Sequence, residues 1–225
     1  MLLMTDVSKT YPGGNVALKD VNIHIQPGEF VFVVGPSGAG KSTFIKMLFR
    51  EVLPTTGTIL VNGMDILSLK PREIPYMRRQ LGIIFQDYRL LPDRTVYDNV
   101  AFAMQVIETP YRKIKRRVLN VLDLVGLRRR ATAYPNELSG GEQQRIAIAR
   151  AIVNDPLLVI ADEPTGNLDP ETGREIMQIF TEINDNGTTI VMATHDKEIV
   201  DSMGKRVVAI EKGRIVRDER NGVYG

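Results

Sequence analysis

The sequence of 225 residues contains no cysteine and no hydrophobic run long enough to cross a membrane. Its longest apolar runs, residues 30–34 and 157–161, have the length of buried strands, whereas a membrane-spanning helix needs about 20 residues. The absence of cysteine excludes a small disulfide scaffold and fits a reducing compartment. The first residues lack the basic start and the cleavage site of a signal peptide, so we expect a cytosolic protein.

The chain also lacks a large excess of either charge, with 29 Lys+Arg against 27 Asp+Glu and a net charge of +2. With 43% hydrophobic residues it has ample material for a core, which excludes a disordered or collagen-like chain. The charge is unevenly placed, because residues 112–130 hold eight basic residues and one acid, Asp123. This basic stretch is interpreted either as a solvated helix face or as a surface attracted to the anionic inner leaflet of a membrane.

Apolar segments rich in Val and Ile alternate with helix-like segments, which predicts an α/β fold with a mainly parallel sheet. Residues 17–25 instead alternate between apolar and polar, which predicts an antiparallel strand in a smaller β-layer. Residues 218–225 are expected to fray. The other strands are predicted at residues 29–34, 58–61, 82–85, 157–161, 188–193 and 206–210.

Strand signals disappear between Thr95 and Pro135. There Ile114, Val118, Leu122 and Val125 recur at helical spacing, and a glycine follows where a helix C-terminal cap belongs. We therefore expect one domain, residues 1–225, in which a helical subdomain (95–135) is inserted into a core formed by residues 1–94 and 136–225.

Residues 35–42 fit the pattern G-x-x-x-x-G-K-[ST] between an apolar strand and a helical stretch at 43–50. Such glycines let successive backbone N–H groups point at phosphate oxygens, and the following helix N-terminus adds partial positive charge. Lys41 would then reach the β- and γ-phosphates and Ser42 would ligate Mg²⁺. The predicted nucleotide-binding residues of this loop are Gly35, Pro36, Ser37, Gly38, Ala39, Gly40, Lys41, Ser42 and Thr43.

Two carboxylates, Asp162 and Glu163, end the apolar run 157–161. A parallel strand delivers acids at its C-terminal end to the crevice where ligands bind. Alone, these acids could be polar residues at the boundary of a strand and a loop. Together with the phosphate loop they predict a nucleoside triphosphatase in which Asp162 acts on the Mg²⁺ side and Glu163 polarises the attacking water.

Residues 138–145, Leu-Ser-Gly-Gly-Glu-Gln-Gln-Arg, resemble the signature motif of the ATP-binding cassette (ABC) ATPases. Ser139, Gly140 and Gly141 would open a second helix with an anion-binding N-terminus. Glu142 replaces the more usual glutamine and is expected to leave the serine and glycines undisturbed. The resemblance implies an ABC ATPase fold and a head-to-tail homodimer in which the signature of one subunit covers the γ-phosphate of ATP held by the other.

The resemblance assigns four further residues. Gln86 matches the Q-loop glutamine that touches Mg²⁺ and water, and His195 the switch histidine at the γ-phosphate. Asp169 matches the D-loop aspartate that acts across the dimer, although a helix N-cap would also explain it. Tyr11 matches the aromatic residue that stacks on adenine, with a buried strand aromatic as the alternative. His24 lies near no motif and is expected at a solvated or edge position.

The resemblance implies catalytic roles for Glu163, His195 and Lys41 and metal ligation by Ser42, Gln86 and Asp162, with ATP and Mg²⁺ as cofactors. Residues 161–169 resemble a branch that serves lipoprotein release, macrolide efflux and cell division, and residues 85–100 look most like its cell-division members. The implied protein works at the cytoplasmic face of a bacterial cell membrane with an integral membrane partner, whose shape changes activate peptidoglycan hydrolases.

Alternatives remain within the same resemblance. An ATPase of a lipoprotein-release or efflux transporter fits the motifs too, and so does a regulatory module that holds ATP without turnover. ABC ATPases that act on DNA or ribosomes typically carry a long coiled-coil insert or two cassettes, so no nucleic-acid partner is expected. Leu90, Leu91 and Pro92 are interpreted either as exposed contacts for the membrane partner or as residues packed within the helical subdomain.

Overall fold

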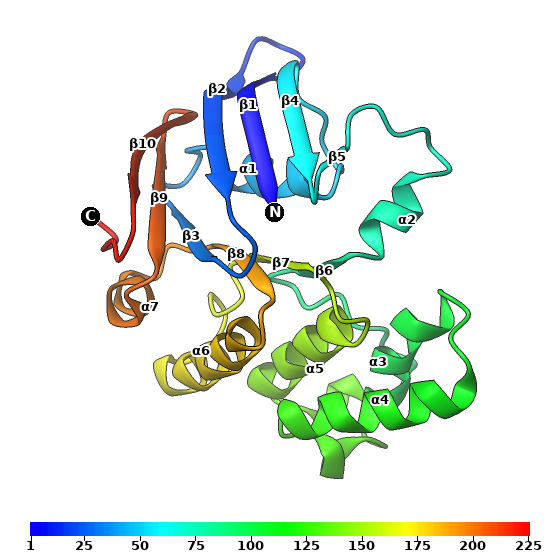
Figure 1. The fold of residues 1–225 in the computed structure, drawn as a ribbon. Helices are drawn as coiled ribbons and strands as arrows, with labels where there is room; N and C mark the ends of the chain where they lie inside the picture. The colour runs from blue at the N-terminus through cyan, green and yellow to red at the C-terminus, as the bar shows by residue number, and fades with distance from the viewer.

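The computed structural model describes residues 1–225, which form two β-sheets and a layer of helices (Figure 1). The smaller sheet is antiparallel, with strand order β2-β1-β4-β5. Its strands are β1 (Leu2–Thr10), β2 (Val16–Ile25), β4 (Thr56–Val61) and β5 (Met64–Asp65). The predicted smaller β-layer is therefore confirmed, and His24 lies exposed on its edge strand β2, as expected.

The larger sheet has the order β10-β9-β3-β8-β7-β6 and is parallel except for its edge strand β10. This confirms an α/β fold with a mainly parallel sheet. Its strands are β3 (Phe30–Val34), β6 (Leu81–Ile84), β7 (Leu158–Asp162), β8 (Thr189–Ala193), β9 (Arg206–Glu211) and β10 (Arg214–Glu219).

Two expectations about strands are wrong. The segment predicted at residues 58–61 belongs to the antiparallel sheet, because its partner is β1 rather than a strand of the core. The C-terminal tail is not frayed as a whole. Asp218 and Glu219 pair with β9, and Arg217 donates to the carbonyl oxygens of Val223 and Tyr224, both at 2.7 Å.

Seven α-helices complete the chain, and two short 3₁₀ helices, η1 (Arg128–Arg130) and η2 (Pro135–Glu137), lie among them. No strand occurs between Thr95 and Pro135, and Gly126, with φ +74°, follows α4 where the cap was predicted. The α-helices are α1 (Lys41–Leu48), α2 (Ile74–Arg78), α3 (Val96–Gln105), α4 (Tyr111–Leu124), α5 (Gly140–Ile152), α6 (Pro170–Asp185) and α7 (Lys197–Met203). None combines the length and the hydrophobicity that crossing a bilayer requires.

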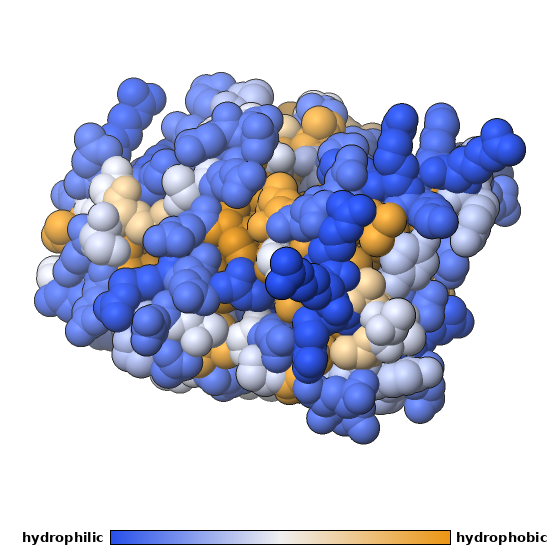
Figure 2. Space-filling model, turned by 90° about the horizontal axis from the view of Figure 1, so that it is seen from below, coloured by the Kyte–Doolittle hydropathy of each residue, from blue (hydrophilic) through white to orange (hydrophobic).

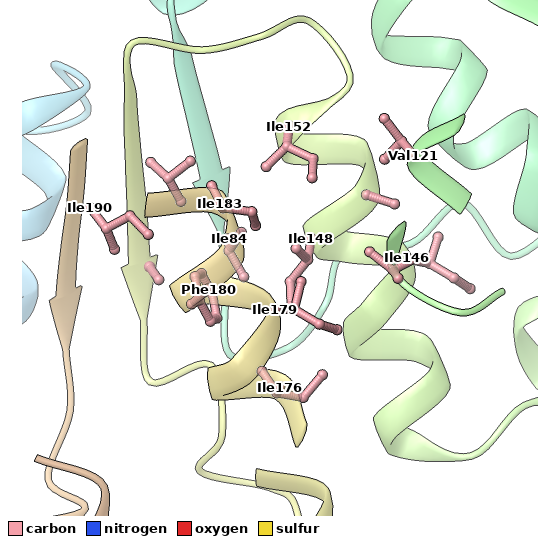
Figure 3. Packing of buried hydrophobic residues seen from close by; sticks show 14 of the residues in the cluster. Ile84, Val121, Ile146, Ile148, Ile152, Ile176, Ile179, Phe180, Ile183 and Ile190 are labelled. Atoms are coloured by element: carbon pink, nitrogen blue, oxygen red, sulfur yellow. The ribbon is translucent and has the colours of Figure 1, made fainter. Parts of the chain in front are cut away.

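The larger sheet is buried on both faces, which explains its unbroken apolar strands. On β3, Phe32 faces the core on the helical side, whereas Val31 and Val33 face the core beneath the smaller sheet. Figure 3 shows the helical side, where the apolar residues of α6 lie between α5 and the sheet. Burial of such a side chain contributes roughly 1.5–3 kcal/mol to the free energy of unfolding. The residues labelled on α6 are Ile176, Ile179, Phe180 and Ile183.

The helices α3 and α4 pack on α5, and their buried residues join the same core as those of α6 and the sheet. Val118 of α4 and Phe180 of α6, for example, are both fully buried in this cluster. The division of the chain into a core and a separate helical subdomain therefore stays a prediction. Seen from the helical side, hydrophilic residues cover most of the surface, and hydrophobic ones appear between them in narrow strips (Figure 2).

Candidate functional site

Predicted site residues that follow four strands of the larger sheet gather at one edge of it, because parallel strands end at the same side. Gly35 follows β3, Glu163 follows β7 and His195 comes two residues after β8. Gln86 comes two residues after β6. The three connections that join these four strands thus bring together residues that are up to 160 positions apart in the sequence.

The phosphate loop has a backbone that only glycine can adopt at two positions. Gly35 has φ +142°, and a Cβ there would lie 2.1 Å from the carbonyl oxygen of Ile210. Gly40 has φ +113°, and its Cβ would lie 2.4 Å from the carbonyl oxygen of Ala17. Gly40 is also the N-cap of α1 and offers no capping side chain. The first N–H groups of α1 are therefore left for an external acceptor.

Lys41 lies beneath this loop with only 8% of the residue exposed. Its Nζ donates to the carbonyl oxygens of Gly35 at 2.7 Å and Pro36 at 3.1 Å, and no carboxylate pairs with it. A buried cation whose hydrogen bonds go only to neutral carbonyl oxygens attracts an anion strongly. The loop and its lysine together form a site suited to phosphate groups.

A cleft of about 660 Å³ opens over the loop. Tyr11 forms part of its wall, half-buried, with its hydroxyl 3.3 Å from Oγ1 of Thr43. The ring is thus not a buried strand aromatic, and adenine stacking stays a prediction. Among the predicted residues the cleft is lined by Tyr11, Gly35, Pro36, Ser37, Gly38, Gly40, Lys41, Ser42, Thr43, Gln86, Glu163 and His195. Ala39 is buried behind the loop.

Sequence reasoning missed four lining residues, namely Asn15, Val16, Ala17 and Tyr224. The first three lie at and before the start of β2. Tyr224 reaches the cleft from the C-terminal tail, whose backbone is held by Asp201 and Arg217. No motif marks these positions, because they line the cleft only through the packing of distant segments.

Glu163 and His195 form a contacting pair at the mouth of the cleft. A carboxylate oxygen of Glu163 meets Nδ1 of His195, and the side chains are 18% and 62% exposed respectively. Glu163 has a left-handed backbone, with φ +50°, although it is not glycine. This backbone conformation costs about 1–2 kcal/mol. A hydrogen bond from the backbone N–H of Glu163 to Ala193 O, at 2.9 Å, helps to hold it in place. The strain aims the carboxylate at His195 and the cleft.

Asp162 lies on the metal side of the predicted site. Burial, and then the charge of Glu163, raise its pKa above the ordinary value, while Lys46 and Lys41 oppose this. Asp162 lines a second cleft of about 360 Å³ together with Ser42 and Gln86. No three His, Cys, Asp or Glu side chains group into a metal site.

The segment after Gln86 was given two interpretations, and the structure divides its residues between them. Leu90 packs against the helical core, Leu91 is half-buried and Pro92 is exposed. Gln86 itself is exposed, and its carbonyl oxygen accepts from Nδ2 of Asn167 at 3.2 Å.

Ser139 is the N-cap of α5 and accepts a hydrogen bond from the backbone N–H of Glu142 at 3.2 Å. Its hydroxyl donates to the Glu142 carboxylate at 3.1 Å, and Arg130 pairs with that carboxylate at 3.5 Å. The expectation that Glu142 leaves the serine undisturbed stays a prediction, because a glutamine side-chain oxygen could accept the same hydrogen bonds. Gly141 allows α5 to approach α6, since a Cβ there would lie 2.4 Å from Cγ2 of Thr172.

Asp169 is the N-cap of α6, as its second interpretation required. The hydroxyl of Thr172 and the backbone N–H groups of Thr172 and Glu171 hold the pKa of Asp169 below its ordinary value. Ser139, Gly140 and Asp169 are all exposed, and none of them lines the cleft over the phosphate loop. One chain thus does not place its signature helix over its own phosphate site.

A phosphate loop and an Asp-Glu strand on a mainly parallel core, with a separate signature helix, define a P-loop ATPase of the ABC class. A family model described as ABC transporter matches residues 18–166, so the chain belongs to the ABC transporter family and is an ATPase of that family.

Particular relatives cover nearly the whole chain. The cell division ATP-binding protein FtsE of Bacillus subtilis is 60% identical over 225 residues, which span 100% of this chain and 99% of that protein. FtsE of Mycobacterium tuberculosis is 54% identical over 226 residues, spanning 100% and 98%. A dimeric ATP-binding cassette, MJ0796, bound to ADP and Pi in a post-hydrolysis state, superposes with a TM-score of 0.88 at 36% identity and 99% coverage of both chains.

Proposed function

We propose that this protein is the ATP-hydrolysing subunit of a membrane-associated complex in bacterial cell division, with an integral membrane partner of the FtsX type. The observation that carries the proposal is the 60% identity to a cell division ATP-binding protein over the entire chain. The complex would work at the cytoplasmic face of the cell membrane, and its ATP cycle would drive shape changes that activate peptidoglycan hydrolases.

ATP would lie with its base against Tyr11 and its phosphates on the loop. Lys41 and the free N–H groups of α1 stabilise the charge that develops on the transferred phosphoryl group. Glu163 and His195 are close enough to share one water, with Glu163 accepting its proton and His195 orienting it. Support for these roles comes from the common cleft that all four residues line.

Mg²⁺ fits this site together with nucleotide phosphates. Ser42, Gln86 and Asp162 line one cleft, and each carries a side-chain oxygen, the kind of ligand that Mg²⁺ takes. The raised pKa of Asp162 would return toward its ordinary value beside a cation. The bound ion would supply neutralisation of phosphate charge in the transition state.

A head-to-tail homodimer would complete the site. Ser139 and Gly141 of the second subunit would cover the γ-phosphate, with Asp169 acting across the same interface. The exposed position of Ser139 outside its own cleft supports this arrangement, and so does the dimeric state of the related cassette MJ0796. The dimer would enclose two ATP molecules.

The variant Glu163→Gln tests the proposed chemistry. It keeps the shape of the side chain but cannot accept a proton, so we expect turnover to fall by about 10²–10⁴-fold while ATP still binds and a persistent dimer accumulates. ATPase rates, nucleotide affinity and sedimentation velocity measure the three effects. Near-normal turnover would remove Glu163 from the role of base.

A pull-down from detergent-solubilised membranes tests the proposed partner. Recovery of an FtsX-type protein, with a higher ATPase rate in its presence, supports the cell-division role. Recovery of a lipoprotein-release or efflux permease would instead support the alternative transporter. Failure of Glu163→Gln to lower a partner-stimulated rate would likewise argue against Glu163 as the base.

We also propose that the basic stretch brings α4 to the anionic membrane surface. Three of its arginines are engaged within the protein: Arg117 binds the carbonyl oxygens of Ile152 and Val153, Arg128 pairs with Asp123, and Arg130 pairs with Glu142. The exposed residues without such partners are Arg112, Lys113, Lys115, Arg116 and Arg129.

Vesicle binding checks this surface. Each exposed basic residue held near an anionic bilayer contributes about 1 kcal/mol, so Arg112→Glu with Arg116→Glu should weaken binding to phosphatidylglycerol vesicles at least tenfold. Lys70→Glu with Arg72→Glu gives the same change in net charge at an exposed site on another part of the chain. Equal weakening by both pairs would indicate a general charge effect.

A further inference from the structure

The backbone between Gln86 and α3 contains two consecutive residues in the left-handed conformation. Tyr88 has φ +57° and Arg89 has φ +47°. Neither is glycine, and side chains disfavour this region, so contacts must hold the turn in place. Gln86 lines the nucleotide cleft, only two residues before this turn.

Side chains from three elements bind the backbone of this segment. Asn167, which follows β7, donates to Gln86 O at 3.2 Å. Asn99 of α3 accepts from Leu91 N at 2.8 Å and donates to Leu91 O at 3.1 Å. Between them, Arg150 of α5 donates to Tyr88 O at 2.7 Å and to Arg89 O at 2.6 Å.

Arg150 has no other polar role in the chain. It is half-buried, it pairs with no carboxylate, and burial lowers the pKa of its guanidinium from the usual value. The left-handed turn presents two successive carbonyl oxygens to the two terminal nitrogens of one guanidinium. An arginine fork meets both oxygens at once, whereas a lysine ammonium lacks this planar geometry.

We infer that Arg150 is a positioning residue that couples Gln86 to the signature helix α5. Both its partners are backbone atoms of the turn that begins two residues after Gln86, and Arg150 lies on the helix whose N-cap is Ser139. A movement of Gln86 toward bound nucleotide therefore also moves α5. In the reverse direction, a movement of Ser139 caused by the second subunit also moves Gln86. This inference rests on the proposed role of Gln86 in hydrolysis.

Hydrogen exchange tests the clamp itself. In the full chain without nucleotide, Arg150→Lys should raise exchange in a peptide covering residues 86–91, where the N–H groups of Tyr88 and Leu91 are hydrogen-bonded. Arg117→Lys is the matched control, because Arg117 also binds two backbone carbonyl oxygens, those of Ile152 and Val153, away from Gln86. Unchanged exchange in 86–91 for Arg150→Lys would overturn the inference.

A kinetic cycle tests whether Arg150 acts through Gln86. We expect Arg150→Lys to lower kcat about tenfold and to change KM less than about threefold, because catalytic geometry is lost while the phosphate loop is intact. In a Gln86→Ala background the same change should lower kcat less than about twofold, because residues that act as a unit are not additive. Arg117→Lys should leave kcat unchanged in both backgrounds.

The outcomes separate this inference from the proposed function. Equal falls in kcat with and without Gln86 would mean that Arg150 supports the fold generally, and the inference would be overturned. It would also be overturned if Gln86→Ala were silent while Arg150→Lys slowed turnover. Failure of the proposed function would be recognised by a different result: Glu163→Gln would hydrolyse ATP as fast as the wild-type protein.

Discussion

The sequence predicts two helix N-termini that bind anions. One chain supplies a complete binding site around the first of them but not around the second. The N-terminus of α1 begins after a glycine, carries no side-chain cap and lies in a cleft with the buried Lys41. The N-terminus of α5 begins after Ser139, is closed by Glu142 in a capping box and is exposed. The first is ready for a phosphate within one chain, whereas the second already holds a carboxylate of its own.

A helix N-terminus becomes a binding site only when the residues packed around it complete the site. Both helices present N–H groups and the same dipole. At α1 the helix itself carries the cation Lys41, and the segments packed around it form the cleft and contribute Glu163 with its left-handed backbone. At α5 no other part of the same chain covers the exposed Ser139. The second N-terminus therefore fits a role at a surface that a second subunit completes.

The largest expected effect separates the two sites directly. Lys41→Ala should weaken ATP binding to the single subunit by about 10–100-fold, because a charge-assisted contact worth about 1.5–3 kcal/mol is lost. Ser139→Ala should leave that affinity within about twofold and should abolish the ATP-dependent dimer of the Glu163→Gln variant. Nucleotide titration and sedimentation velocity measure the two effects.

Stability must be checked for both variants, because Ser139→Ala also removes an N-cap worth about 1 kcal/mol. Denaturant unfolding without nucleotide supplies this control. Unchanged ATP affinity in Lys41→Ala would argue against the phosphate loop as the binding site. A large loss of affinity in Ser139→Ala would show that the two N-termini act within one chain.

A second prediction concerns Asp162, whose ionised carboxylate lowers the stability of the folded protein. The pKa of Asp162 is raised in the folded protein, so the folded state binds more protons and loses stability as pH rises above the ordinary carboxyl pKa. Asp162→Asn cannot ionise, and we expect it to raise Tm at neutral pH without nucleotide while lowering Mg²⁺-dependent turnover.

The gain in Tm should shrink as the pH falls and should vanish below about pH 4, where the aspartate is protonated in both states. Thermal unfolding from pH 3.5 to pH 8 checks the sign. A lower Tm for Asp162→Asn at neutral pH would mean that hydrogen bonding to the carboxylate outweighs its burial.

The smallest effect is expected from Glu142→Gln at α5. A first-turn acid stabilises a helix by about 0.3–1 kcal/mol, so the variant should unfold at slightly lower denaturant concentration. The same charge repels an incoming γ-phosphate, so its removal should tighten the ATP-bound dimer by about two- to fivefold in a Glu163→Gln background. Sedimentation equilibrium measures the dimer, and weaker dimerisation would indicate that the carboxylate assists closure.

Most of the fold could be predicted, because its signals are local. Apolar runs located the five parallel strands of the larger sheet to within one or two residues, and helical spacing located α4. The parts that were missed, β1, β10 and the fastening of Tyr224, depend on pairing between segments far apart in the chain. The placement of β4 was wrong for the same reason, since its sequence does not say which strand it will meet.

The candidate site also contains local features that could be predicted and long-range contacts that could not. The phosphate loop and the acid pair could be predicted because each is a continuous motif with a mechanism of its own. The contacts of Arg117 and Arg150 could not, because their acceptors are backbone carbonyl oxygens, which every residue carries. A charge run alone does not say which of its arginines are already engaged.

Three continuous motifs specify the chemistry: a glycine loop with a lysine, an acid pair at the end of an apolar strand, and a serine-led helix. These motifs are local, and their spacing along the chain is enough to specify them. Their relative positions depend on the packing: the loop and Glu163 share a cleft, the serine-led helix lies outside it, and the Glu142 carboxylate accepts hydrogen bonds from Ser139. Those facts depend on which strands pair and which helices pack, and such contacts join residues that the chain keeps far apart.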